Sequence, residues 1–163
     1  MQEPLLEMVR IALSGRHIHI NPVHALEGID ADQAAAVPVD GVHSCWHLLH
    51  HTVFWQDLML EALRGKTVGW PETNSVSWPA PREKCDARVW SDLVGRFRDG
   101  VAEAKTLAES VDAKTALPGW PKVTASGAFM ILAQHNAYHI GEIVVMRQVL
   151  GFWPPPGKSQ TFF

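Results

Sequence analysis

The sequence lacks an excess of positive charge, a long apolar run and a cysteine framework, and each absence excludes a class of protein. Its 14 basic residues are outnumbered by 17 acidic ones, so the net charge is −3 and no basic field is present to hold nucleic acid. No apolar run approaches the roughly 18 residues of a membrane span. The start of the chain has neither the basic nor the apolar region of a signal peptide, which predicts a cytoplasmic protein. In that compartment Cys45 and Cys85 are expected to be free thiols.

What the chain does contain is an unusual number of histidines and tryptophans. Its 163 residues suit a single domain that spans residues 1–163. Hydrophobic residues make up 47% and charged residues 19%, a composition typical of globular rather than disordered chains. Nine histidines are many for this length, and seven tryptophans stand against one tyrosine. We therefore look for chemistry among the histidines.

Apolar residues recur at helical spacing in four stretches, and no segment shows a convincing period-two pattern of a strand. The predicted helices cover residues 3–13, 42–63, 86–111 and 124–150. Thr124 or Ser126 is the expected cap at the beginning of the last helix, and Gly151 is suited to end it.

The connections between these helices are long, and the chain ends in a tail that cannot be helical. Residues 16–41 and 66–84 form the longer loops, and residues 26–28 and 30–34 of the first loop are the stretches where a helical turn is expected. Three successive prolines in the tail, residues 152–163, exclude helix there. These features predict an all-α fold, a four-helix bundle with long loops and a proline-rich C-terminal tail.

Two pairs of histidines lie inside the predicted helices. His47 and His51 are four residues apart in the second helix, and His135 and His139 repeat that spacing in the fourth. Residues four apart lie about 40° from one another around a helix, so two such imidazoles can share one metal ion. Glu142 falls within about 20° of His135 and projects to the same face.

The pattern has an ordinary explanation and a functional one. A single such pair also arises by chance, and histidine is often a core or surface residue without a metal. Here both pairs are embedded in apolar stripes, where an imidazole needs a polar partner. A shared ion would supply it, and three imidazoles would leave a position open for water or substrate, as in catalytic zinc sites. The remaining loop histidines and the one at the start of the second helix are expected to face solvent: His17, His19, His24 and His43.

The histidine pairs belong to longer motifs. These are HLLHHTVFWQD at residues 47–57, HNAYHIGEIV at residues 135–144 and RQVLGFWPP at residues 147–155. Together they resemble the DinB-like (damage-inducible) superfamily, and the order and spacing agree over about residues 5–155. The resemblance implies an up-down-down-up four-helix bundle that holds one divalent metal ion.

The resemblance also implies the ligands. His51 precedes the small, apolar and aromatic residues that follow the family's first ligand, so His51, His135 and His139 are the implied metal ligands. His47 is the alternative first ligand or a group that supports one. Zinc or nickel is the expected ion, although imidazole also suits copper and iron.

The chain departs from the family at Glu142, where glutamine is frequent. Glu142 is therefore the candidate catalytic residue, as a base acting on water. The alternatives are direct approach to the metal, an ion pair with Arg147, or a hydrogen bond to the imidazole of a ligand.

Three hypotheses for function follow. Members of the family with known activity are similar to thiol S-transferases, so the resemblance implies a metal-dependent enzyme that directs a low-molecular-weight thiol onto an electrophile. Hydrolysis is the rival reaction at the same site. The second hypothesis is a non-catalytic, metal-binding stress-response module that acts as a homodimer, and the third is a metal-free bundle with packed histidines. Neither nucleic acid nor membrane is an expected partner.

The other notable side chains are expected to have structural roles. Tyr138, beside the histidine pair, is expected to pack rather than to contact substrate. Cys45 is expected to be a buried, inert thiol. Trp70 and Trp78 of the long loop, and the aromatic residues of the tail, are candidate contact surfaces, with packing over the bundle ends as the preferred interpretation.

Overall fold

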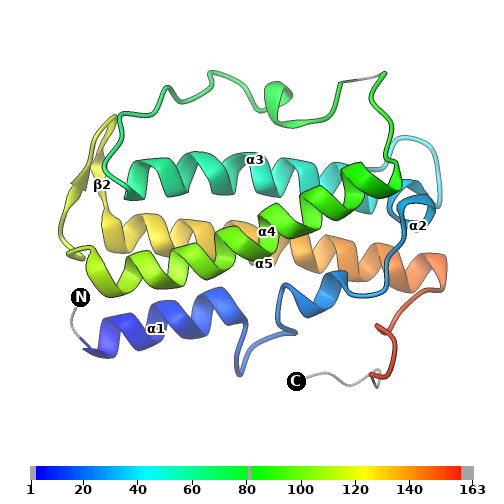
Figure 1. The fold of residues 1–163 in the computed structure, drawn as a ribbon, viewed down its shortest axis with the longest axis horizontal. Coiled ribbons are helices and arrows are strands. Elements are labelled where there is room, and N and C mark those ends of the chain that lie inside the picture. The colour runs from blue at the N-terminus through cyan, green and yellow to red at the C-terminus, as the bar shows by residue number, and fades with distance from the viewer. Residues whose placement is uncertain (1–2, 81, 159–163) are drawn as a thin grey trace.

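The computed structural model describes residues 3–80 and 82–158 (Figure 1). Its elements in chain order are α1 (Glu3–Ser14), η1 (His24–Leu26), α2 (Ala31–Ala35), α3 (Cys45–Leu63), η2 (Asn74–Ser77), α4 (Ala87–Ser110), β1 (Ala116–Leu117), β2 (Trp120–Thr124) and α5 (Ala125–Leu150). The elements η1 and η2 are short 3₁₀ turns within loops. The fold is mostly helical, which confirms the predicted all-α class, and each predicted helix is present with ends shifted by only a few residues.

The four longer helices in the described chain lie side by side (Figure 1). Helix α3 packs against both α4 and α5, and α1 packs against the same two helices. In Figure 1, α1 and α5 run from left to right, whereas α3 and α4 run from right to left. The shared direction of α3 and α4 follows from their connection, which returns along the length of the molecule before α4 begins.

Polar side chains mark the beginnings of the long helices. Ser44, Asp86 and Thr124 precede α3, α4 and α5, and each accepts a hydrogen bond from a backbone N–H three residues further on. Thr124 is one of the two predicted caps. Gly151 ends α5 with a φ of 82°, a left-handed conformation that favours glycine.

The apolar core consists of two groups of buried side chains. One contains Val9 of α1, Leu60 of α3 and Phe129 of α5. The other contains Phe97 of α4 and Ile140 of α5, together with the start of α3 and the α2 region. Along α5, the two candidate ligand histidines lie between these groups.

A small hairpin is the main difference from the sequence-based expectation. Strands β1 and β2 pair antiparallel, with Ala116 opposite Thr124 and Leu117 opposite Trp120. The turn between them contains Gly119 with a φ of +77°. Strand β1 has only two residues, and in the five-residue β2 the apolar Trp120 and Val123 are three residues apart, so neither strand shows a period-two pattern.

The described part of the tail, residues 152–158, is not helical. Residues 159–163 lie outside the described residues. The expectation that the aromatic residues Phe162 and Phe163 form a contact surface or pack over the bundle end therefore concerns residues outside the described part of the chain. No helix of the described residues combines the length and the apolar character needed to cross a membrane.

Candidate metal centre

Three imidazoles from two helices converge at one point. His51 projects from α3, and His135 and His139 project from α5, which packs against α3. The ring centroids are 5.2 Å apart for His51 and His135, 4.7 Å for His51 and His139, and 4.6 Å for the pair on α5. One nitrogen of each ring lies within 4.8 Å of the other two. The structure therefore brings together the three residues that the resemblance implied.

The surroundings keep two of these rings uncharged at neutral pH. His51 is 5% exposed, and burial, reinforced by the nearby His139, lowers its pKa to about 4. Burial is also the main cause that lowers the pKa of the partly buried His135 to about 3. A neutral imidazole has a lone pair to give, which is the form that binds a metal.

The nitrogens on the outer side of the cluster differ in their partners. His139 donates from Nδ1 to the carboxylate of Glu142 at 2.7 Å. Of the alternatives for Glu142, this contact matches the hydrogen bond to the imidazole of a candidate ligand. Nδ1 of His51 lies 2.6 Å from the hydroxyl of Ser77. Nδ1 of His135 is buried and has no hydrogen-bond partner among the described residues.

Sequence reasoning missed two residues that complete the wall of the cluster. Ser77 is fully buried. Trp78 lies between two imidazoles, stacked on His51 at 4.2 Å and on His43 at 3.9 Å. Both come from the long connection between α3 and α4, where no helical periodicity or motif distinguishes them. Trp78 therefore packs inside the molecule, as does Trp70, whose ring lies 4.5 Å from that of Trp120.

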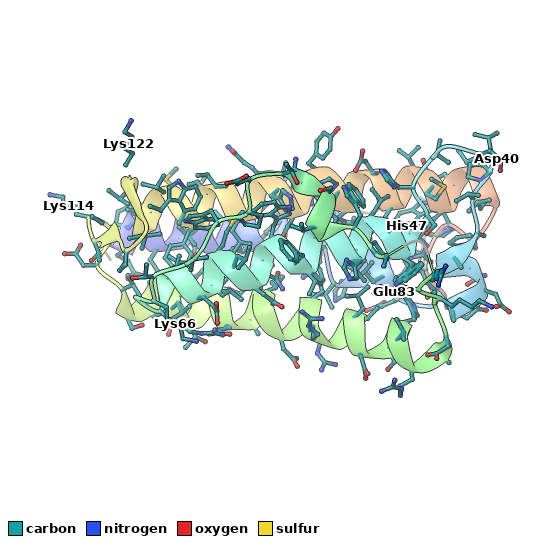
Figure 2. The ribbon with its side chains drawn as sticks, turned by 90° about the horizontal axis from the view of Figure 1, so that it is seen from above. Asp40, His47, Lys66, Glu83, Lys114 and Lys122 are labelled. Atoms are coloured by element: carbon teal, nitrogen blue, oxygen red, sulfur yellow. The ribbon has the colours of Figure 1, made fainter. Side chains whose placement is uncertain are left out.

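The structure places His47 away from the cluster. Its Nδ1 lies 2.7 Å from the hydroxyl of Ser44 and accepts a hydrogen bond from the backbone N–H of Ser44. These contacts form the capping box at the beginning of α3. In Figure 2, His47 lies toward the end of the molecule that also carries Asp40 and Glu83. His47 therefore lies outside the three-histidine cluster of this structure, and its Nδ1 serves the cap of α3.

The remaining histidines lie outside the cluster, and three of the four that were expected to face solvent do so. Nδ1 of His50 lies 2.8 Å from the backbone carbonyl oxygen of Ser77, so this ring contacts the loop and not the cluster. His17, His24 and His43 are exposed, and His19 is half-buried.

Two further predictions concern Cys45 and Arg147. Cys45 is fully buried, and burial raises the pKa of its thiol to about 11, so it is the inert thiol that was expected. The buried guanidinium of Arg147 donates to the backbone carbonyl oxygens of Ala25, Glu27 and Phe152. It contacts these carbonyls rather than Glu142, so the proposed ion pair between Glu142 and Arg147 is wrong.

A groove of about 690 Å³ lies beside the cluster. Glu142 and Tyr138, which contact His139, form part of its wall together with His43. The rest of the lining is mainly apolar and includes Val145 and Met146. Tyr138 is 66% exposed and meets the ring of His139 edge-on. The groove therefore adjoins the cluster through Glu142 and Tyr138, and the three converging imidazoles are not part of its described lining.

The donor set fits a divalent transition metal ion. Nε2 of His51 and Nε2 of His135 are 3.4 Å apart, and two such nitrogens need a proton or a cation between their lone pairs. Neutral imidazoles in a partly enclosed setting are common ligands of zinc and nickel. Fold and site together define a helical protein with a three-histidine cluster compatible with a metal site.

Comparison with protein families agrees with this class. The family model of the DinB superfamily matches residues 22–143. The chain belongs to the DinB superfamily, as its histidine motifs predicted. Neither the curated proteins nor the solved structures contain a match to this chain.

Proposed function

We propose that this protein is a metal-dependent enzyme of the DinB-like type, in which His51, His135 and His139 hold one divalent ion, zinc or nickel. The observation that carries the proposal is the convergence of one nitrogen from each ring within 4.8 Å. The low pKa values of His51 and His135 support it, because both rings are in the ligating form at neutral pH. Three nitrogen ligands leave a divalent ion at least one position for a small molecule.

The chemistry we propose is transfer of a low-molecular-weight thiol to an electrophile, with hydrolysis as the rival reaction. When bound, a divalent ion lowers the pKa of a thiol or a water molecule and supplies a nucleophile near neutral pH. Glu142 orients the ring of His139 through their hydrogen bond. Its side chain also borders the groove, where it is the candidate base.

The groove beside the cluster supports an enzyme over a purely structural metal site. Its apolar lining by Val42, Val145 and Met146 suits the apolar part of a small organic substrate. Glu142 is a polar group in the wall of the same groove, together with His43 and the hydroxyl-bearing Tyr138.

We further propose that the bundle has the up-down-down-up topology that the resemblance implies. The opposite directions of α1 and α5 relative to α3 and α4 support this assignment (Figure 1). A single domain and a cytoplasmic location stay predictions from the sequence.

The first test is the metal content of tag-free protein grown without added metal, measured by elemental mass spectrometry. Wild type is expected to hold one divalent ion per chain, and His51→Ala and His135→Ala are expected to lose it. His24→Ala is the matched control, because this exposed histidine lies outside the cluster. A metal-free wild type whose stability does not change with a chelator would overturn the proposal.

The second test addresses the reaction. Zinc-loaded and nickel-loaded proteins are screened for thiol transfer and for hydrolysis, with Val145→Phe as a variant that narrows the groove. We expect activity in the wild type, a raised KM in Val145→Phe and unchanged metal content in that variant. Activity that survives the loss of metal in His135→Ala would contradict the mechanism.

A non-catalytic, metal-binding module that acts as a homodimer is the second candidate. The observation that favours it is a set of exposed apolar side chains on one strip of α5: Tyr138, Val145 and Val149 are 66%, 57% and 63% exposed. If this strip joins two copies of the chain, Val145→Glu combined with Val149→Glu yields a monomer in sedimentation experiments. Met8→Glu on α1 is the control, because Met8 is similarly exposed at 58%. A wild type that is monomeric at high concentration excludes this candidate.

A further inference from the structure

Ser77 reaches the histidine cluster from outside the two helices that carry it. It is the last residue of η2, in the connection between α3 and α4, and its side chain is 0% exposed. Its Oγ lies 2.6 Å from Nδ1 of His51 and 2.6 Å from the backbone carbonyl oxygen of Asn74. One buried hydroxyl therefore stands between a loop carbonyl and a candidate ligand ring.

The direction of both hydrogen bonds follows from the chemistry of the three groups. The carbonyl oxygen of Asn74 can only accept, so the single proton of the Ser77 hydroxyl goes to it. The hydroxyl oxygen is then an acceptor toward His51, and Nδ1 of His51 must carry a proton. A neutral imidazole has one N–H, so the lone pair of His51 resides on Nε2. That atom is the one that faces Nε2 of His135 at 3.4 Å.

Further contacts hold the loop at this point independently of the hydroxyl. The backbone carbonyl oxygen of Ser77 lies 2.8 Å from Nδ1 of His50, the residue beside His51 on α3. The next residue, Trp78, stacks on the ring of His51. Removal of the hydroxyl alone therefore leaves the loop two contacts with α3.

We propose that Ser77 is a positioning residue, which fixes His51 as the tautomer with its proton on Nδ1 and directs the lone pair of Nε2 into the cluster. The assignment of the tautomer stands on the hydrogen bonds alone. Its consequence for metal binding rests on the proposed function, because without an ion that lone pair serves only the contact with Nε2 of His135.

Two other histidines of the chain can be compared with His51 for the ring nitrogen that carries the proton. His139 also donates from Nδ1, in its case to the carboxylate of Glu142. His47 is the opposite case, because its Nδ1 accepts from the backbone N–H of Ser44 and its proton resides on Nε2. The two tautomers thus occur side by side in one protein, and each is set by the partner of Nδ1.

The tautomer is tested without metal. In chelator-treated protein labelled with ¹⁵N-histidine, long-range ¹H–¹⁵N correlation spectra near neutral pH report which ring nitrogen carries the proton. We expect His51 to carry it on Nδ1 in the wild type, and Ser77→Ala to shift it toward Nε2. Ser75→Ala is the matched control, since this exposed serine of the same short helix contacts the hydroxyl of Thr73 and leaves His51 as in the wild type. A wild-type His51 protonated on Nε2, or a tautomer unchanged in Ser77→Ala, would overturn the inference.

The consequence for metal binding is tested with zinc alone, in competition with a chromophoric chelator. Ser77→Ala is expected to bind zinc about 10–100-fold more weakly than wild type, the usual effect of removing a hydrogen-bond partner of a ligand imidazole. Ser75→Ala is expected to bind as wild type does. If the wild type takes no zinc, the proposed function fails while the spectra still decide the tautomer. If wild type and Ser77→Ala bind zinc equally tightly, the role of Ser77 in metal binding fails alone.

Discussion

At the scale of single residues, the roles of His47, His51 and His139 differ according to what the Nδ1 of each ring contacts. The carboxylate of Glu142 and the hydroxyl of Ser77 accept from two rings whose other nitrogens face the cluster. The ring of His47, although one helical turn from His51, is occupied by the capping box of α3. Identical side chains on one helix thus serve as candidate ligand and as cap.

Substitution of Glu142 tests the support of a ligand ring. Glu142→Ala removes the acceptor for Nδ1 of His139, and we expect zinc affinity to fall about 10–100-fold. Glu142→Gln retains an amide oxygen as acceptor and is expected to bind more tightly than Glu142→Ala. Competition titration with a chelator measures both, with the exposed Gln134→Ala on the same helix as control. Equal affinity of Glu142→Ala and wild type would show that this hydrogen bond does not support the site.

The metal-free protein is expected to lose stability as the pH falls from 6.5 to 5. In the unfolded chain an imidazole takes up its proton near pH 6.5, whereas in the folded chain burial holds the pKa of His51 at about 4 and that of His135 at about 3. The unfolded state therefore binds more protons in this range, and the free energy of unfolding falls by up to about 1.4 kcal/mol per pH unit for each ring. His139, His43 and His50 are the titratable neighbours that reinforce the shift of the His51 pKa.

Urea unfolding in the presence of a chelator, at a series of pH values, measures this slope. His135→Leu is expected to reduce it, because one of the two buried titrating rings is gone. His24→Leu, at an exposed position, is expected to retain the slope of the wild type. A slope that His135→Leu leaves unchanged would contradict the buried neutral state of this ring.

At the scale of elements, a buried amide joins three helices next to the cluster. Gln56 of α3 accepts a hydrogen bond from Asn136 of α5 and donates to the carbonyl oxygen of Phe97 on α4. The close approach of the Gln56 side chain to α4 requires a glycine at position 100, since a Cβ there would lie 2.1 Å from Nε2 of Gln56. The side chain of Gln56 is fully buried, so it has no open space into which to move.

Gly100→Ala is therefore expected to destabilise the protein even though alanine is the better helix former. Overpacking of a core costs about 1–3 kcal/mol, which exceeds the helix propensity of about 1 kcal/mol that alanine adds. Gly95→Ala on the same helix is the control, because its Cβ would meet no described atom within 4 Å. Thermal and urea unfolding should show Gly100→Ala below wild type and Gly95→Ala at or above it. The reverse order would contradict the close contact of α3 and α4.

At the scale of the whole molecule, Arg147 joins segments far apart in the sequence. Its guanidinium is 1% exposed and donates to carbonyl oxygens of the first long loop, 122 and 120 residues away, and to the start of the tail. The rings of Phe152 and Trp153 lie 5.7 and 5.3 Å from it. Burial lowers the pKa of this guanidinium from its ordinary value, and the carbonyl oxygens replace the water that it loses.

Arg147→Met is expected to destabilise the fold strongly. It leaves the buried carbonyl oxygen of Ala25 and the carbonyl oxygen of Phe152 without their charged donor, and a hydrogen bond to a charged group contributes about 1.5–3 kcal/mol. The total loss is expected to exceed about 3 kcal/mol in urea unfolding. Arg88→Met removes a side chain that is 82% exposed and should change stability by less than about 0.5 kcal/mol. Similar stabilities of the two variants would contradict the structural role of Arg147.

The helical class, the approximate bounds of the long helices and the pairing of His135 with His139 could be predicted from the sequence. These features are local, because helical periodicity, caps such as Thr124 and the spacing of four residues depend only on neighbours in the chain. The family resemblance added His51 as the partner from the second long helix, and its role as a metal ligand stays a proposal.

The groups that surround the cluster could not be predicted from the sequence, because they are set by how distant segments pack. His51 and His135 are 84 residues apart, and their approach depends on how α3 and α5 pack and rotate against each other. Ser77 and Trp78 come from a loop without periodicity, so no local pattern could place them against His51. The separation of His47 from the cluster and the contact of Gly100 with Gln56 likewise arise from packing between elements, which spacing along one helix does not encode.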